Sequence, residues 1–188
     1  MTDHRQPGPY REHRPLVGPP PSAHARTRGF FFVHSAPRAL ASHLQWQVTA
    51  TWGPEVEFDW RPQPLLPGHV RAEASWHGTP GSAGRLISTL RGWGRVRAEA
   101  TEEPSPGHEG ERYSLTPELG VFRAAIGPCG DILVSEERLR AALARGSAPG
   151  GDVPTEMSQI LGEPWDAELE PFRHSGDASP VRWMHRVG

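Results

Sequence analysis

Two adjacent residues near the beginning of the chain, His34 and Ser35, have the side chains that nucleophilic catalysis uses. They lie at the end of an apolar run that begins at residue 30. A serine at a sharp turn beside a histidine can act as a nucleophile with its base. No G-x-S-x-G motif surrounds Ser35, however, and the sequence places no Asp or Glu to orient His34. Because serine is a favoured helix N-cap, we interpret Ser35 as the cap of the following helix and predict no catalytic residue.

A glycine-rich stretch at residues 77–85, HGTPGSAGR, is a candidate site for a small anion. It leads into a predicted helix, whose free N–H groups and positive dipole end can hold a phosphate or carboxylate. Its glycine spacing matches neither G-x-G-x-x-G nor a P-loop, so simple turn geometry is the competing interpretation. With two residues from the first predicted helix start, the candidate ligand-binding residues are His34, Arg38, His77, Gly81, Ser82, Gly84 and Arg85.

The segment 163–172 is acidic and aromatic together. Its apolar side chains fall at helical spacing, which leaves two interpretations open. A terminal helix packed on its own core would show this stripe. A surface that docks a protein partner would also show it, since Trp and Phe ringed by charge are suitable anchors. The residues of the docking hypothesis are Trp165, Asp166, Glu168, Leu169, Glu170 and Phe172.

The residue types exclude or disfavour several chemistries. All twenty Lys and Arg positions are Arg, so neither a Schiff-base lysine nor a P-loop lysine exists. Cys129 is the single cysteine, which excludes an intramolecular disulfide and fits a reducing cytoplasm. The ten His do not fall at metal-ligand spacing, so we predict no metal and no cofactor. No apolar run reaches the length of a membrane span.

The charge is unevenly distributed along the chain. Residues 1–28 contain five Arg, one Asp and one Glu and so carry +3, whereas the remainder carries −5 of the total of −2. This first segment is rich in Pro and poor in apolar residues, so we predict that it is disordered. A body of negative net charge is unsuited to wrapping a nucleic-acid backbone. Binding of nucleic acid through the basic arm is therefore only a third hypothesis.

The candidate residues must be positioned by a mixed α+β fold. Over residues 29–101 the periodicity predicts β-α-β-β-α-β, a ferredoxin-like split β-α-β core. The strands are expected at 29–34, 56–60, 70–77 and 96–101, and the helices at 36–52 and 80–93. Residues 102–188 are predicted to form an extension packed on this core, so that 29–188 is one globular unit. Its expected strands are 112–116, 121–126, 132–134 and 181–187, and its helices follow the caps Ser135 and Asp152.

Several segments of this body together resemble one known family. They are FFFVHSAPRAL at 30–40, LRGWG at 90–94, TEEPSPG at 101–107, RYSLTPELGVF at 112–122, GDILVSEERLRAAL at 130–143 and WDAELEPFR at 165–173. The combination resembles the actinobacterial domain of unknown function 3145 over about residues 27–188. The resemblance implies an actinobacterial cytoplasmic protein but no reaction. The resemblance also suggests a gene neighbourhood beside fatty-acid synthesis genes, and this neighbourhood implies a protein partner in fatty-acid metabolism.

These observations lead to three functional hypotheses. The first is a non-enzymatic cytoplasmic accessory or regulatory protein that acts through protein contacts, with the acyl-CoA or fatty-acid synthesis machinery as the suggested partner. The alternative is an enzyme or sensor of a small anionic ligand, phosphorylated or CoA-type, at the residues given above. Nucleic-acid binding through the N-terminal arm comes third.

Overall fold

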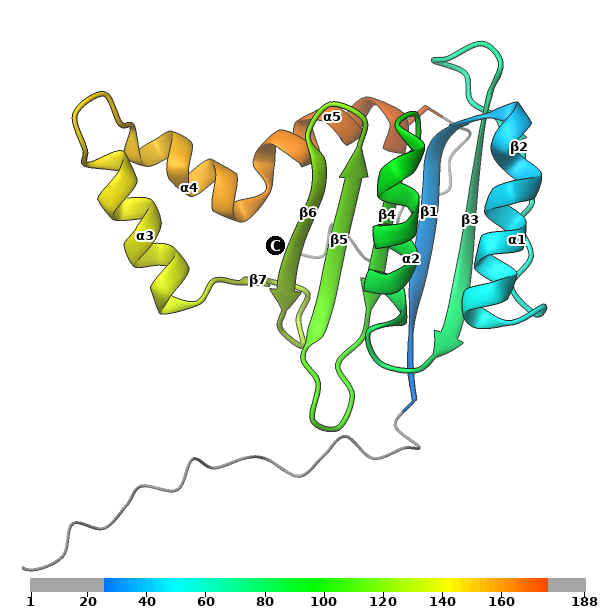
Figure 1. Cartoon of the computed structure of the whole chain (residues 1–188), viewed down its shortest axis with the longest axis horizontal. Helices are drawn as coiled ribbons and strands as arrows, with labels where there is room; N and C mark the ends of the chain where they lie inside the picture. The colour runs from blue at the N-terminus through cyan, green and yellow to red at the C-terminus, as the bar shows by residue number, and fades with distance from the viewer. Residues whose placement is uncertain (1–25, 176–188) are drawn as a thin grey trace, which may run out of the picture.

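The structure, a computed structural model, describes residues 26–175 and centres on one antiparallel sheet (Figure 1). Seven strands of this part of the chain lie in the order β2-β3-β1-β4-β5-β6-β7. They are β1 (Thr27–Pro37), β2 (Arg61–Pro62), β3 (His69–Gly78), β4 (Arg97–Glu102), β5 (Gly110–Thr116), β6 (Gly120–Ile126) and β7 (Ile132–Leu133). The predicted mixed α+β class is confirmed, whereas the finer ferredoxin-like assignment stays a prediction.

The helices lie on both faces and at one end of the sheet (Figure 1). They are α1 (Ala41–Trp52), α2 (Ser82–Leu90), α3 (Glu136–Gly146), α4 (Val153–Leu161) and α5 (Glu163–Arg173), with short 3₁₀ turns η1 (Arg38–Leu40) and η2 (Arg91–Trp93). Helices α1 and α2 cover one face, α5 crosses the other, and α3 and α4 project beyond β6. In residues 26–175, no helix is long and apolar enough to cross a membrane.

The hydrophobic core lies between the sheet and the helices α1 and α2. Alternate residues of a strand point to opposite faces, and Phe31 and Val33 of β1 therefore reach this core together. The helices contribute fully buried side chains, which are Leu44 and Val48 of α1 and Leu86, Ile87 and Leu90 of α2. Burying each such side chain contributes about 1.5–3 kcal/mol, so this layer fixes how α1 and α2 sit on the sheet.

The interpretation of Ser35 as a helix cap is wrong. Strand β1 continues to Pro37, Ser35 pairs with Arg97 of β4, and Pro37 precedes the first helical turn. The register of β1 against β3 shifts between Val33 and Ala36, which is a β-bulge. Pairing on both sides of β1 keeps the backbone extended here, and this long-range constraint outweighs the local preference of serine for a cap.

The predicted strand at 56–60 is also wrong, because only the two residues of β2 pair with β3. The side chain of Gln45 on α1 instead holds this segment. Its Nε2 donates to the carbonyl of Val56 at 2.7 Å, and its Oε1 accepts from the N–H of Phe58 at 3.0 Å. A helix amide thus supplies the partners that a neighbouring strand would have supplied.

Most other predicted elements are present with small changes at their ends. Ser135 and Asp152 cap α3 and α4, as predicted, by accepting from the N–H groups of Arg138 and Thr155. Strand β1 begins at Thr27, so the last two residues of the segment predicted to be disordered lie in the sheet. Residues 1–25 and the predicted strand at 181–187 lie outside the described residues.

Candidate functional site

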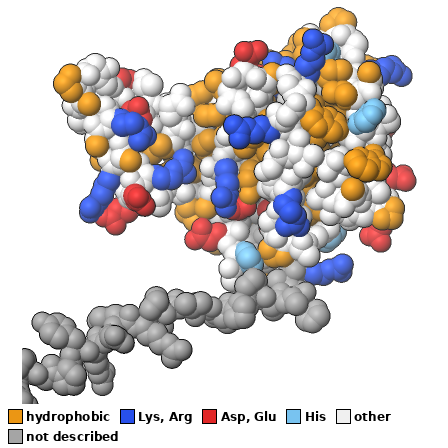
Figure 2. Space-filling view, in the orientation of Figure 1, with side chains coloured by type: hydrophobic (Ala, Val, Ile, Leu, Met, Phe, Trp, Pro, Cys, Tyr) orange, Lys and Arg blue, Asp and Glu red, His pale blue; other side chains and the backbone are white. Residues whose placement is uncertain are grey.

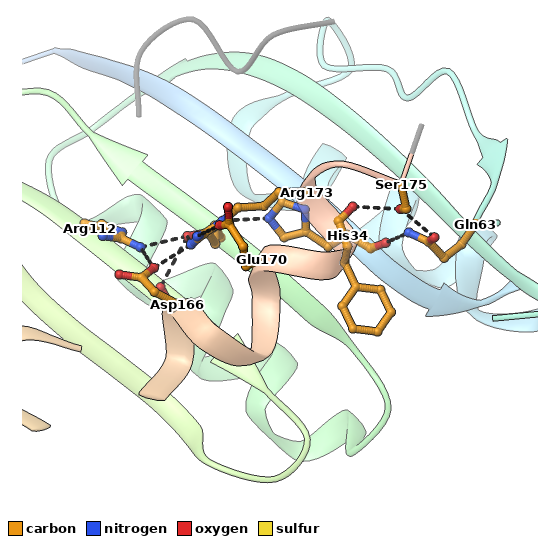
Figure 3. A network of polar contacts seen from close by, with 10 residues as sticks. His34, Gln63, Arg112, Asp166, Glu170, Arg173 and Ser175 are labelled. Atoms are coloured by element: carbon orange, nitrogen blue, oxygen red, sulfur yellow. Dashed lines mark hydrogen bonds and ion pairs between the residues drawn. The ribbon is translucent and has the colours of Figure 1, made fainter. Parts of the chain in front are cut away.

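A buried cluster of charged side chains lies between the sheet and α5 (Figure 3). Its centre is Glu99 of β4, whose side chain is fully buried. The carboxylate accepts from His34 Nε2 at 2.7 Å, from Arg173 at 2.6 and 2.9 Å, and from Arg112 at 3.1 Å. A carboxylate buried this deeply requires such partners, because removing its charge from water is costly. We call these four residues the Glu99 cluster.

Strand alternation places the Glu99 cluster on the face opposite the hydrophobic core. His34, Glu99 and Arg112 come from β1, β4 and β5, which are neighbours in the sheet. Phe32 pairs with Glu99, and Glu99 pairs with Ser114, so these positions point to the same side. The three strands therefore present one polar row to α5.

Helix α5 completes the Glu99 cluster and ties it to further acidic residues. Arg173 also donates to Asp166 at 2.5 Å and to Glu170 at 3.0 Å, and Asp166 accepts from Arg112 as well. Glu168 pairs with Arg97 of β4 at 3.1 Å. These ion pairs, together with the buried Leu169, hold the helix to the sheet.

The charges of the cluster shift its acid–base behaviour. Burial acts to raise the pKa of Glu99, but the hydrogen bond and charge of His34, followed by those of Arg173, hold that pKa well below its usual range. Burial acts to lower the pKa of Arg173, but Glu99 and Asp166 raise it above its ordinary value. Glu99 is therefore a carboxylate, and His34 must donate its Nε2–H to it.

The sequence did not indicate which acidic residue orients His34. Glu99 lies 65 residues away and forms the carboxylate–imidazole pair that the sequence did not predict. Ser35 does not join this pair, because it is fully buried and its hydroxyl has no hydrogen-bond partner among the described residues. The geometry gives an oriented histidine but no serine nucleophile beside it.

A pocket with a volume of about 240 Å³ lies at one end of this polar face. His34 and Arg173, each 6% exposed, form its most buried polar walls. Its other lining residues come from β1, β3, the segment at β2 and α5, and they are Phe32, Val33, Asp59, Arg61, Arg71, Ala72, Glu73 and Phe172. Of the predicted ligand-binding residues, His34 alone lies here.

The structure does not bring the predicted ligand-binding residues into one site. His77 is exposed and pairs with Arg28, near the far end of β1 from His34. Arg38 is exposed on η1. Gly81, Gly84 and Arg85 line a separate, wider groove of about 870 Å³ between α2 and residues 107–113.

The start of α2 is occupied by a carboxylate of the chain itself. Glu102, which is 3% exposed, accepts from the N–H of Gly81 at 2.5 Å and from that of Ala83 at 3.2 Å. The hydroxyl of Ser82 accepts from Trp52 Nε1 at 2.9 Å. A Cβ on Gly84 would lie 2.5 Å from the Tyr113 hydroxyl. These contacts explain the Gly-Ser-Ala-Gly sequence by packing and by an internal anion.

The segment 163–172 packs on its own sheet as α5. Leu169 is fully buried, Trp165 donates to the carbonyl of Gly120 at 3.1 Å, and the Arg97 guanidinium lies 4.7 Å from the Phe172 ring centre. With Asp166 and Glu168 in ion pairs, Glu170 is the one exposed member of the proposed docking set. The terminal-helix interpretation thus describes most of these residues.

In residues 26–175, no group of three or more His, Cys, Asp or Glu side chains is placed to hold a metal ion.

Comparisons with known proteins give one result. Neither the curated proteins nor the solved structures contain a match. A family model matches residues 30–186, which is most of the chain and includes the Glu99 cluster and α5. The chain therefore belongs to the family described as "Protein of unknown function (DUF3145)".

Proposed function

We propose that this protein is a non-enzymatic accessory or regulatory protein that binds a protein partner in the cytoplasm. The observation that carries the proposal is an uneven distribution of exposed apolar side chains. In the described residues seven large hydrophobic side chains are exposed, and three of them, Leu133, Leu139 and Leu143, come from the short stretch 133–143. Gathered exposed apolar side chains are typical of interaction surfaces, whereas scattered ones are not.

Most of this stretch belongs to an arm that extends from the end of the sheet (Figure 1). We call β7, α3 and α4 the leucine arm. Of the eleven residues of α3, only Ala142 and Gly146 are buried. Gly146 lets α4 pack closely, since a Cβ there would lie 2.6 Å from the Cα of Val153. Figure 2 shows hydrophobic side chains on the surface of this arm.

Leu139 and Leu143 are one helical turn apart and so lie on the same side of α3. They are 36% and 43% exposed, and Leu133 on β7 is 45% exposed. A helix that buries only two small residues contributes little to the core, and its leucines are available to a partner. We therefore propose that the partner contacts the leucine arm and not α5.

The chemistry of the Glu99 cluster favours a role other than catalysis. Glu99 is engaged by three basic side chains, and Arg173 by three carboxylates. Groups compensated in this way hold a helix in place and exchange protons poorly.

The proposal that the partner belongs to the fatty-acid or acyl-CoA machinery rests on the family resemblance alone. The nucleic-acid hypothesis rests on an arm whose residues 1–25 lie outside the described part.

We also infer that residues 27–102 form a ferredoxin-like unit. The antiparallel order β2-β3-β1-β4, with α1 and α2 on one face, supports this inference. Strand β3 lies between β1 and β2 and is antiparallel to both, as a split β-α-β unit requires. Strands β5, β6 and β7 then extend the same sheet.

The leucine arm can be tested by exchanging its exposed leucines for polar residues. The double variant Leu139→Ser/Leu143→Ser should lose no more than about 2 kcal/mol of stability, because both side chains are partly exposed and serine is only a somewhat poorer helix former than leucine. In pull-downs from the native cytoplasm followed by mass spectrometry, it should lose a partner that the wild type retains. The purified partner should then show the same difference by calorimetry.

Leu65→Ser is the matched control, since Leu65 is 49% exposed but lies outside the arm. This control should retain the partner. Capture of the same proteins by all three forms, or a wild-type protein that purifies alone, would contradict the proposal.

A further inference from the structure

Two arginines face each other across neighbouring strands beside His34. Arg61 of β2 is the register partner of Arg71 of β3. Like charges at directly opposite positions of a sheet destabilise it. Both side chains line the pocket of about 240 Å³ described above. The structure thus contains a local repulsion that its own contacts only partly relieve.

The β-bulge brings His34 to this pair. Between the pairs Val33–Ala72 and Ala36–Val70, two residues of β1 lie opposite the single residue Arg71. Arg71 is on the same face as Glu73, which is the register partner of Phe32, so Arg71 and His34 lie on one side of the sheet. Bulges commonly redirect side chains at functional sites. Three basic side chains therefore converge on the pocket from adjacent strands.

The available carboxylates leave part of this positive charge uncompensated. Asp59 pairs with Arg61 at 2.9 Å, and both groups are largely exposed. Glu73 also lines the pocket but is exposed. Within residues 26–175, Arg71 forms no ion pair and no hydrogen bond with its side chain. The Nδ1 of His34 likewise has no hydrogen-bond partner in this part of the chain, although the residue is 94% buried.

The segment that carries Arg61 is held rigidly against β1. Gln63, which is 3% exposed, donates from Nε2 to the carbonyl of His34 at 2.6 Å. Its Oε1 accepts from the N–H of Leu65 at 3.1 Å and from Ser175 Oγ at 2.7 Å (Figure 3). Glu99 fixes the ring of His34 from the other side. The His34 side of the pocket and the backbone that carries Arg61 are therefore held in place, which favours recognition of a small ligand.

We propose that this pocket binds a small anion that carries a carboxylate or a phosphate. Arg71 would provide the main charged contact and Arg61 a second one, and Nδ1 of His34 would add a third by donating when the imidazole carries both protons. The volume equals that of about eight water molecules at about 30 Å³ each, so a compact anion or the head group of a larger one fits. The site goes beyond the proposed partner binding, since it uses β1, β2, β3 and α5 instead of the leucine arm.

The test measures binding of two probes, sodium phosphate and sodium succinate, to the full chain by calorimetry and thermal unfolding. Ionic strength is held constant with sodium chloride. The wild type should bind at least one probe saturably, and the two probes distinguish a phosphate ligand from a carboxylate ligand. Arg71→Gln should weaken that binding at least about tenfold, the effect of losing one charge-assisted hydrogen bond. Arg91→Gln is the matched control, because Arg91 is an exposed arginine outside the pocket.

Thermal unfolding separates a binding role from a structural one. Without a probe anion, Arg71→Gln should unfold at the same or a higher temperature than the wild type, because it removes the repulsion with Arg61. With the anion, the order should reverse, since only the wild type gains stability. If Arg71→Gln does not fold, Arg61→Gln provides the same test at a side chain that is 66% exposed.

Three results would overturn the proposal. The first is no saturable binding of either probe to the wild type at tens of millimolar. The second is an equal loss of binding in the Arg71 and Arg91 variants, which would indicate nonspecific attraction. The third is an Arg71→Gln variant that is less stable than the wild type at every anion concentration, which would make Arg71 purely structural.

Discussion

The face of the sheet beneath α1 and α2 is filled by apolar side chains, whereas the face beneath α5 is held by ionised ones. On the first face, residues such as Phe31, Leu86 and Ile87 are buried without polar contacts of their side chains. On the second, Glu99, Arg112 and Arg173 are buried together by direct ion pairs. Apolar packing stabilises any close-packed arrangement through buried area, whereas charged hydrogen bonds also require each partner at a fixed distance and angle. The position of α5 therefore depends on charged contacts in addition to the buried Leu169, whereas the positions of α1 and α2 depend mainly on buried apolar area.

The largest effect is expected from Glu99→Ala on the polar face. The change leaves Arg112, Arg173 and His34 buried without their shared carboxylate, so stability should fall by about 3–5 kcal/mol. Urea unfolding at neutral pH, followed by tryptophan fluorescence and circular dichroism, measures this loss. Glu118→Ala, at an exposed acidic position, should change stability by less than about 0.5 kcal/mol. A loss below about 1 kcal/mol in the Glu99 variant would show that the cluster does not hold α5.

The matching change on the apolar face is Leu86→Ala. Leu86 is fully buried on α2, and its truncation should cost about 2–5 kcal/mol through lost burial and a cavity. This loss should be the same in low and high salt, and the loss in the Glu99 variant should also change little with salt, because buried charges are screened weakly. The partly exposed Leu65 provides the control substitution to Ala. A loss below about 1 kcal/mol in Leu86→Ala would contradict the role of this side chain in the core.

A smaller effect concerns the dependence of stability on pH. The pKa of Glu99 is lowered in the folded protein, so its contribution is present above its unfolded pKa of about 4.3 and is lost as the pH falls toward the folded value. The wild type should therefore lose up to about 1.4 kcal/mol per pH unit from this group below that unfolded pKa. Glu99→Gln should show a shallower decline over the same range, while Leu86→Ala should parallel the wild type. Equal acid slopes in all three proteins would contradict the assignment.

Sequence periodicity predicted the apolar face better than the polar one. The strands β3 and β4 and the caps Ser135 and Asp152 are local features, and the structure confirms them, although the polar positions of β4 are buried as well. Ser35 was misread because a bulge depends on both neighbours of β1, which lie far along the chain. The segment at 56–60 was misread because the side chain of Gln45 replaces a strand partner.

The Glu99 cluster itself could not be predicted from local pattern. In the sequence, Glu99 alternates with alanines, as an exposed residue of a half-buried strand would. Its burial depends on α5, whose Arg173 lies 74 residues away. The acidic and aromatic composition of 163–172 showed that the segment was unusual, but a partner protein and the chain's own sheet satisfy that composition equally well. Only the fold shows that the sheet supplies the arginines.

Strands β1, β4 and β5 precede α5 in the chain, and this order has a consequence for synthesis on the ribosome. Strands β1, β4 and β5 emerge long before α5, and N-terminal elements generally fold first. Until Arg173 is translated, Glu99 has only His34 and Arg112 as charged partners, and its face of the sheet stays open to water. We expect the nascent chain to remain in a loosely packed state that closes when α5 arrives. A chain that lacks α5 therefore keeps Glu99 solvated and lacks the ion pairs of Arg173 that close this face.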